Sequence, residues 1–120
     1  MIKGIHAMFF TSEPEALREF LRDKLGLSGT DIGGGWLNFD VPTAEMGVHP
    51  AMNEGEKIVP SGTHDISFYC DDIEATVKEL TSRGVAFLQP VECQGFGKIT
   101  RFEMPGGVQA SLYEASYPQT

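Results

Sequence analysis

The feature that most constrains this chain is an internal repeat. When the sequence is shifted by 59 residues, positions 6–23 align with positions 65–82. Chance gives roughly one identity in a window of this length at ordinary composition, whereas this alignment has several. The identical pairs are Phe9 with Phe68, Glu15 with Glu74, Ala16 with Ala75 and Leu21 with Leu80. The chain is therefore predicted to fold as two copies of one supersecondary unit.

A shift of 58 residues is the competing alignment, and it pairs His6 with His64. That alignment sets Leu21 against Glu79, so it breaks the hydrophobic pattern of the helices. Because side chains alternate between faces along a strand, a slip of one residue inverts every position. The 59-residue register therefore makes Asp65 the counterpart of His6 and turns His64 to the opposite face.

Each repeat begins with a strand and continues with a helix. The strands are predicted over 5–11 and 65–70, where β-branched and aromatic residues are frequent. Capping-box spacing follows each strand, in Ser12 with Glu15 and in Asp71 with Glu74. Glycines stand where a C-terminal helix cap is expected, at Gly26 and Gly84.

Three further extended segments follow each helix. They lie at 27–32, 35–41 and 45–49 in the first repeat, and at 85–89, 98–104 and 108–114 in the second. Each repeat therefore reads β-α-β-β-β, which predicts an α+β protein with module one at 4–49 and module two at 62–115. The segment 50–61, with prolines, a glycine and charges, is predicted to be the linker. A chain of 120 residues has the size of one domain.

Composition excludes several classes of function. The net charge of −8 argues against nucleic acid and anionic membranes as partners, since both require clustered Lys and Arg. No apolar run approaches the ~18 residues that a membrane span needs, and the N-terminus lacks the layout of a signal peptide. The two cysteines, Cys70 and Cys93, are too few for a disulfide framework. A cytoplasmic protein is expected.

In these features the chain resembles the vicinal oxygen chelate superfamily of glyoxalases, bleomycin resistance proteins and extradiol dioxygenases. The resemblance covers about residues 4–115. Besides the duplicated plan, three blocks carry it: IHAMFF…LREFLRDKLGL, DISFYCDDIEATVKELTSRGV and RFEMPGGVQASLYE. It implies a single domain whose two β-α-β-β-β modules form a curved, open, barrel-like mixed sheet with helices outside. It also implies a homodimer that binds a small molecule.

Metalloenzymes of this superfamily bind one divalent ion, such as Zn, Ni, Fe or Mn, through the first and last strand of each module. The resemblance puts His6 and Asp65 at the first-strand positions and Ser111 at the last-strand position of module two. In module one the position falls nearest Gly47, and Glu45 or His49 serves if the register shifts by two. The predicted metal ligands are His6, Glu45, His49 and Asp65. A neutral serine hydroxyl is a poor ligand, so Ser111 weakens the metal hypothesis.

Alternation along 65–70 turns Ile66, Phe68 and Cys70 towards the helix, and Asp65, Ser67 and Tyr69 towards the cavity. The residues predicted to bind a ligand are Phe10, Trp36, Tyr69, Ser111 and Tyr113.

Two functions remain open on the sequence. The first is a divalent-metal-dependent lyase, isomerase or dioxygenase acting on a small oxygen-bearing molecule. The alternative is a metal-free protein that binds or sequesters a small molecule, as bleomycin resistance proteins do. No catalytic residue is assigned.

Overall fold

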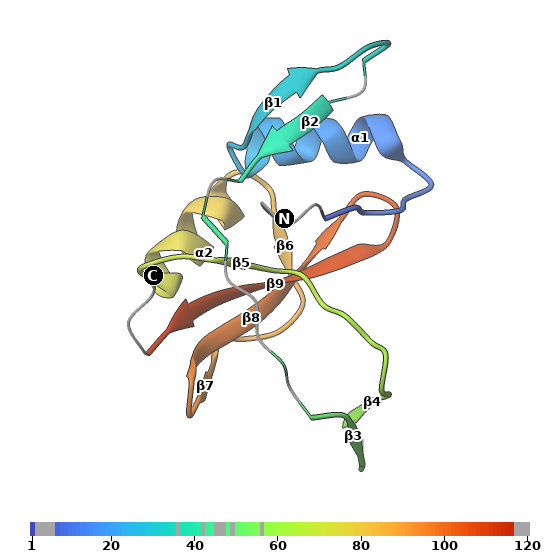
Figure 1. Cartoon of the computed structure of the whole chain (residues 1–120). Coiled ribbons are helices and arrows are strands. Elements are labelled where there is room, and N and C mark those ends of the chain that lie inside the picture. Colours follow the sequence, from blue (N-terminus) through green and yellow to red (C-terminus); the bar gives the residue numbers. More distant parts are fainter. Residues whose placement is uncertain are drawn as a thin grey trace.

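The structure is a computed structural model that describes residues 1, 7–35, 37–41, 43–44, 48, 50–55 and 57–116. Two helices and several strands make up the described part, with both helices against one face of the main sheet (Figure 1). This agrees with the predicted α+β class, and the sheet does not close into a barrel. None of the described helices is long and apolar enough to cross a membrane.

Module two forms a mixed five-stranded sheet. Its strand order is β5-β9-β8-β6, with β7 also paired to β8. The parallel partner of β5 is β9, and the other pairs are antiparallel. The bounds are β5 Ser67–Tyr69, β6 Ala86–Phe87, β7 Glu92–Gln94, β8 Gly97–Met104 and β9 Val108–Ala115. The predicted strands of module two are therefore present, and β7 is an additional one.

Helix α2 (Ile73–Ser82) packs on this sheet through Ile73 and Leu80, both buried. Its C-cap residue is Arg83, and Gly84 follows with φ of 88°, the left-handed conformation typical of the position after a helix. This glycine therefore acts as predicted.

Module one contributes α1 (Pro14–Glu19), which continues into a π-helical turn, η1 (Phe20–Lys24). The wider turn is seen in the hydrogen bond from Leu25 N to Phe20 O, 3.1 Å, five residues back. A separate hairpin of β1 (Ser28–Asp31) and β2 (Leu37–Asp40) follows. Its turn contains Gly33, Gly34 and Gly35, all at positive φ, a conformation that glycine adopts readily.

The two modules share one hydrophobic core. Phe102 of β8 is 1% exposed and lies at its centre. Its ring centroid is 6.4 Å from that of Phe20 in module one and 6.1 Å from that of Phe68 in module two. The buried apolar residues are Leu17, Phe20, Leu21, Ile73, Leu80, Val85, Phe102, Met104, Ala110 and Leu112. Burial of these side chains holds the helices of both modules to the same sheet face.

Residues that the 59-residue spacing relates lie in contact with each other. The rings of Phe9 and Phe68 are 6.5 Å apart. Arg83 Nη1 donates to the Lys24 carbonyl at 2.9 Å, a separation of 59 positions. The two repeats therefore meet at these pairs.

Several local predictions were wrong. Neither predicted capping box forms: the N-cap of α2 is Asp72, whose side chain accepts from Ala75 N, and α1 has no side-chain cap from Ser12. Instead Thr11 Oγ accepts from the backbone N–H of Glu13, and Pro14 occupies the first turn. A proline there removes one of the N–H groups that lack an acceptor within the helix.

The first predicted strand and the predicted linker also differ from the structure. Residues 7–11, the described part of the first strand, form no strand, and the edge of β5 has no strand partner among the described residues. The linker holds a small hairpin, β3 (Met52–Glu54) with β4 (Lys57–Val59), which extends away from the rest of the molecule (Figure 1). The predicted third segment of module one, 45–49, lies outside the described residues except for Val48. The module boundaries stay a prediction.

Candidate functional site

One face of the five-stranded sheet carries no helix among the described residues, and we call it the helix-free face. Phe102, Met104 and Leu112 point into the core beneath the helices. Because neighbouring side chains point to opposite faces, the residues between them belong to the helix-free face. Its central members are Ser67, Tyr69, Ile99, Arg101, Ser111 and Tyr113. The predicted alternation of β5, with Phe68 towards the core and Ser67 and Tyr69 away from it, is therefore present.

Strand register sets these residues in two adjacent rows. Arg101 of β8 stands opposite Ser111 of β9, which stands opposite Ser67 of β5. In the next row Ile99 stands opposite Tyr113, which stands opposite Tyr69. The first row is polar with one cation, and the second is apolar and aromatic.

The guanidinium of Arg101 is the centre of the polar row. Its Nη1 donates to Ser111 Oγ at 2.9 Å and lies 3.7 Å from Asp65 Oδ2. Ser111 is 1% exposed, whereas the Arg101 side chain is 32% exposed and that of Asp65 is 63% exposed. The buried hydroxyl thus helps to fix the guanidinium, while the longer, exposed ion pair contributes little to its position.

A cavity of about 1150 Å³ runs along the edge of β5 that has no strand partner in the described part of the chain. It reaches both faces of the strand, since Ser67 and Tyr69 line it together with Phe68 and Cys70. On the far side it is lined by residues of segment 7–11, α1 and β2. Asp65 also lines it, as do Ser67 of the polar row and Tyr69 and Tyr113 of the aromatic row. Ile99, Arg101 and Ser111 are not part of its lining. Its volume is slightly larger than the roughly 300–1,000 Å³ of ordinary small-molecule sites.

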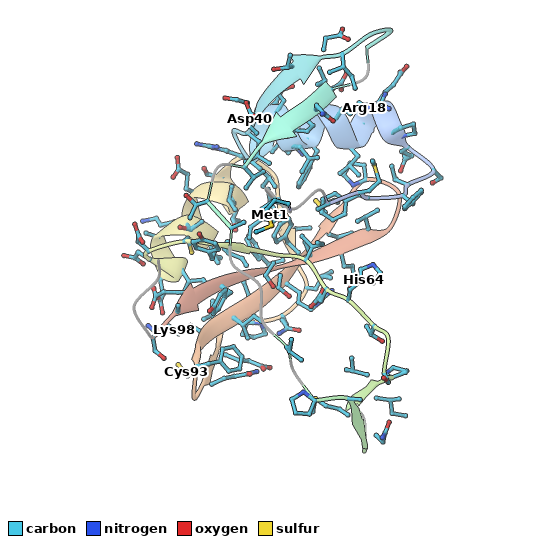
Figure 2. The ribbon with its side chains drawn as sticks, viewed as in Figure 1. Met1, Arg18, Asp40, His64, Cys93 and Lys98 are labelled. Atoms are coloured by element: carbon cyan, nitrogen blue, oxygen red, sulfur yellow. The ribbon has the colours of Figure 1, made fainter. Side chains whose placement is uncertain are left out.

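The structure describes only some of the predicted site residues. Of the predicted metal ligands only Asp65 is described; His6, Glu45 and His49 lie outside the described residues. The exposed His64 lies on the segment between β4 and β5 (Figure 2). These metal assignments stay predictions.

Among the predicted ligand-binding residues, Tyr69 and Tyr113 line the cavity. Ser111 lies buried under Arg101, and Phe10 is 88% exposed and does not line the cavity. Trp36 lies outside the described residues. The ligand-binding role of all five stays a prediction.

Arg101 was missed by the sequence reasoning. The alternation of side chains that was used for β5 also applies to β8. Because Phe102 and Met104 lie in the core, Arg101 shares the opposite face with Glu103 and Ile99. What the sequence does not contain is the pairing of β8 with β9, which brings Arg101 beside Ser111.

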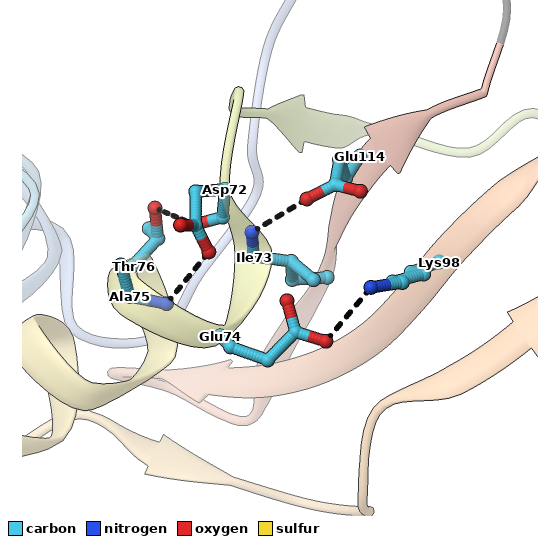
Figure 3. A network of polar contacts seen from close by, with 7 residues as sticks. All are labelled: Asp72, Ile73, Glu74, Ala75, Thr76, Lys98 and Glu114. Atoms are coloured by element: carbon cyan, nitrogen blue, oxygen red, sulfur yellow. Dashed lines mark hydrogen bonds and ion pairs between the residues drawn. The ribbon is translucent and has the colours of Figure 1, made fainter.

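A group of three carboxylates could hold a metal ion elsewhere. Ligand oxygens of Asp72, Glu74 and Glu114 lie within 4.8 Å of one another at the start of α2 (Figure 3). Each already has a protein partner: Asp72 accepts from Ala75 N, Glu114 from Ile73 N, and Glu74 from Lys98 Nζ, all at 3.0 Å. The hydrogen bond from Lys98 lowers the pKa of Glu74. Asp72 and Glu114 thus cap the N-terminus of α2, and Glu74 forms an ion pair with Lys98.

Comparison with known proteins identifies the class. Residues 5–112 match the model of the Glyoxalase/Bleomycin resistance protein/Dioxygenase superfamily. The chain therefore belongs to this superfamily, as its duplicated pattern and helix-covered mixed sheet indicate. No match is found among curated proteins.

Solved structures agree with this assignment. A superfamily member from Sphaerobacter thermophilus DSM 20745 has 25% identity and a TM-score of 0.61, covering 94% of this chain and 98% of that one. The antibiotic-binding protein TnmS3 from Streptomyces sp. CB03234 has 21% identity and a TM-score of 0.64, with 97% and 100% covered. Lactoylglutathione lyase from Agrobacterium tumefaciens has 16% identity and a TM-score of 0.59, with 93% and 96% covered. At these identities the similarity to the last two concerns the fold alone.

Proposed function

We propose that this protein binds a small organic molecule reversibly and without a metal ion. The observation that carries the proposal is the position of Arg101. Its guanidinium contacts both Asp65 and Ser111, the two module-two positions at which the family resemblance expects metal ligands. A fixed cation thus occupies the neighbourhood where a metalloenzyme would hold its ion.

Electrostatics argues against a divalent ion between these two residues. Like unit charges ~4 Å apart near a protein surface repel each other by about 4 kcal/mol, and a divalent ion doubles this. Asp65 already lies beside the guanidinium, and Ser111 offers only a neutral hydroxyl. The module-two half of the predicted metal site therefore does not fit a metal ion.

The cavity beside β5 supports binding of an organic molecule. Its lining is mostly apolar, with Tyr69 and Tyr113 adding aromatic rings next to the polar row. Apolar walls with a few oriented polar groups are typical of small-molecule sites. The fold is also that of an antibiotic-binding protein, TnmS3, which shows that the scaffold supports such a role.

Metal content separates this proposal from the alternative, a divalent-metal-dependent lyase, isomerase or dioxygenase using His6 with Glu45 or His49 and Asp65. We expect protein purified from medium containing Zn, Ni, Fe and Mn to hold less than stoichiometric metal by mass spectrometry. Its thermal midpoint should be insensitive to chelators and should rise with aromatic ligands, because ligands that bind only the native state stabilise it. A stoichiometric metal that His6→Ala removes would establish the alternative instead.

The predicted homodimer is likewise a proposal, supported by the family resemblance. Light scattering at micromolar concentration should give twice the monomer mass of 13.1 kDa. A mass of one chain under those conditions would contradict it.

A further inference from the structure

The helix-free face carries a single basic side chain within the described five-stranded sheet. Its strands contain only two basic residues, Lys98 and Arg101, both on β8. Lys98 points to the helix side, where its Nζ lies 3.0 Å from Glu74 of α2 (Figure 3). Arg101 is therefore the one cation that these strands present to the helix-free face. In a chain of net charge −8 such a cation is a localised site for an anion.

An apolar surface adjoins this cation. The row of Ile99, Tyr113 and Tyr69 is two residues away from the polar row on each strand, about 7 Å at ~3.4 Å per residue. The ring of Phe96 lies 6.1 Å from that of Tyr113 and extends the aromatic surface. A molecule with an acidic group at one end and a flat apolar body of ~7 Å matches this order of cation and aromatic rings.

Resting on the binding function proposed above, we infer that the ligand is an aromatic or apolar organic anion. Its carboxylate, or a comparable oxyanion, binds the guanidinium of Arg101 beside the Ser111 hydroxyl. Its body lies over Tyr113 and Tyr69. A planar guanidinium suits this role because its N–H groups match the two oxygens of a carboxylate.

The charge of Asp65 gives a test that separates anion binding from metal binding. Its carboxylate is 3.7 Å from Arg101 Nη1 and is largely exposed, so it competes with an incoming anion for the same cation. Removing the charge of Asp65 should therefore strengthen anion binding. If Asp65 were a metal ligand, the same substitution would weaken binding of the metal, so the two hypotheses predict opposite outcomes.

The test measures binding of three matched probes to the full chain by calorimetry. The probes are naphthalenecarboxylate, its neutral carboxamide, and the cationic naphthylmethylammonium. We expect the carboxylate to bind at least about tenfold more tightly than the amide, as a charge-assisted hydrogen bond implies. Arg101→Gln should abolish this preference, and Arg101→Lys should retain part of it, since it keeps the charge without the planar fork. Asp65→Asn should tighten carboxylate binding several-fold.

Arg22 and Asp23 provide the matched controls. They form an exposed ion pair of the same residue types, 2.7 Å apart, on η1. Arg22→Gln and Asp23→Asn should leave all three affinities unchanged. Circular dichroism of each variant establishes that it is folded.

The outcomes distinguish the inference from the proposed function. If carboxylate and amide bind equally and Arg101→Gln changes neither, the inference is overturned while small-molecule binding stands. The inference also fails if no saturable carboxylate binding occurs at millimolar concentration. If binding of a probe requires a stoichiometric metal and Asp65→Asn removes both, the proposed metal-free function is overturned as well.

Discussion

At the scale of single residues, the two cysteines differ in surroundings. Cys70 follows β5 and its thiol donates to the Tyr113 carbonyl at 3.7 Å, partly buried. Burial raises the pKa of the Cys70 thiol. Cys93 is exposed on β7 (Figure 2). Only the thiolate reacts with disulfide reagents.

We predict that Cys93 reacts with a disulfide reagent at neutral pH at least about tenfold faster than Cys70. The Cys70 rate should rise as the pH increases towards its elevated pKa, because the thiolate fraction increases. The measurement is thiol release over time in Cys93→Ser and Cys70→Ser, each of which isolates one thiol. Equal rates in the two variants would contradict the prediction.

Gly106, in the turn between β8 and β9, lies close to the side chain of Thr11. Its φ is 86°, and a Cβ at this position would overlap Thr11 Oγ. That hydroxyl donates to the Pro105 carbonyl at 2.9 Å and so connects module one to the turn. Gly107 has a similar φ of 73° but has open space around a Cβ.

Gly106→Ala should therefore destabilise the protein more than Gly107→Ala. Gly107→Ala should lower the free energy of unfolding by about 1–2 kcal/mol, the cost of a left-handed backbone for a residue with a Cβ. Gly106→Ala has this cost and in addition the overlap with Thr11. Urea unfolding gives both values. In the double variant Thr11→Ala/Gly106→Ala part of the additional cost should disappear. Equal costs for the two alanines would show that the Thr11 contact is absent.

At the scale of elements, the N-terminus of α2 is capped by its own N-cap residue and by a residue of β9. Asp72 accepts from Ala75 N, and Glu114 of β9 accepts from Ile73 N (Figure 3). Helix N-termini bind carboxylates well because their N–H groups lack partners within the helix. The contact from Glu114 therefore fixes where the helix begins relative to the sheet.

Glu114→Ala should lower the free energy of unfolding by about 1–2 kcal/mol, because Ile73 N then loses its acceptor. Glu114→Gln keeps an oxygen acceptor and should cost less. Glu92→Ala, at an exposed position of β7, serves as the control and should be nearly neutral. Urea denaturation followed by circular dichroism measures all three. A loss from Glu92→Ala as large as that from Glu114→Ala would contradict this account.

Some helices and strands were predictable from the sequence, and others were not. Amphipathic periodicity identified α2, β8 and β9, since each buries one face on the same core. Capping was misassigned because Asp71 and Asp72 are adjacent and the first fits the consensus spacing, while the second has the right backbone conformation. The hairpin β3–β4 was missed because its glycine and charges are also typical of a linker.

At the scale of the whole molecule, the core couples the modules. Phe20 of module one stacks on Phe102 of module two, with ring planes 19° apart. Both rings are buried, at 7% and 1% exposure. Neither module can therefore bury its apolar face alone, and we expect one cooperative unfolding transition.

Phe20→Ala should lower the free energy of unfolding by about 3–5 kcal/mol, through lost burial and a cavity in the shared core. Amide hydrogen exchange should report the same loss in α1 and in β8, because both unfold together. Phe10→Ala is the control, since Phe10 is 88% exposed and should change stability little. Protection lost in α1 alone would show that the modules unfold independently.

The sequence by itself determined the duplication, the fold class and most of module two, because these depend on hydrophobic periodicity along short stretches. It also placed Ser67 and Tyr69 on one face of β5. Only the tertiary structure decided that Arg101 lies against Ser111 and Asp65. These three residues come from separate segments, and their proximity depends on the pairing of β8 with β9 and of β9 with β5. Such pairing is set by packing of the whole core, so no local pattern contains it.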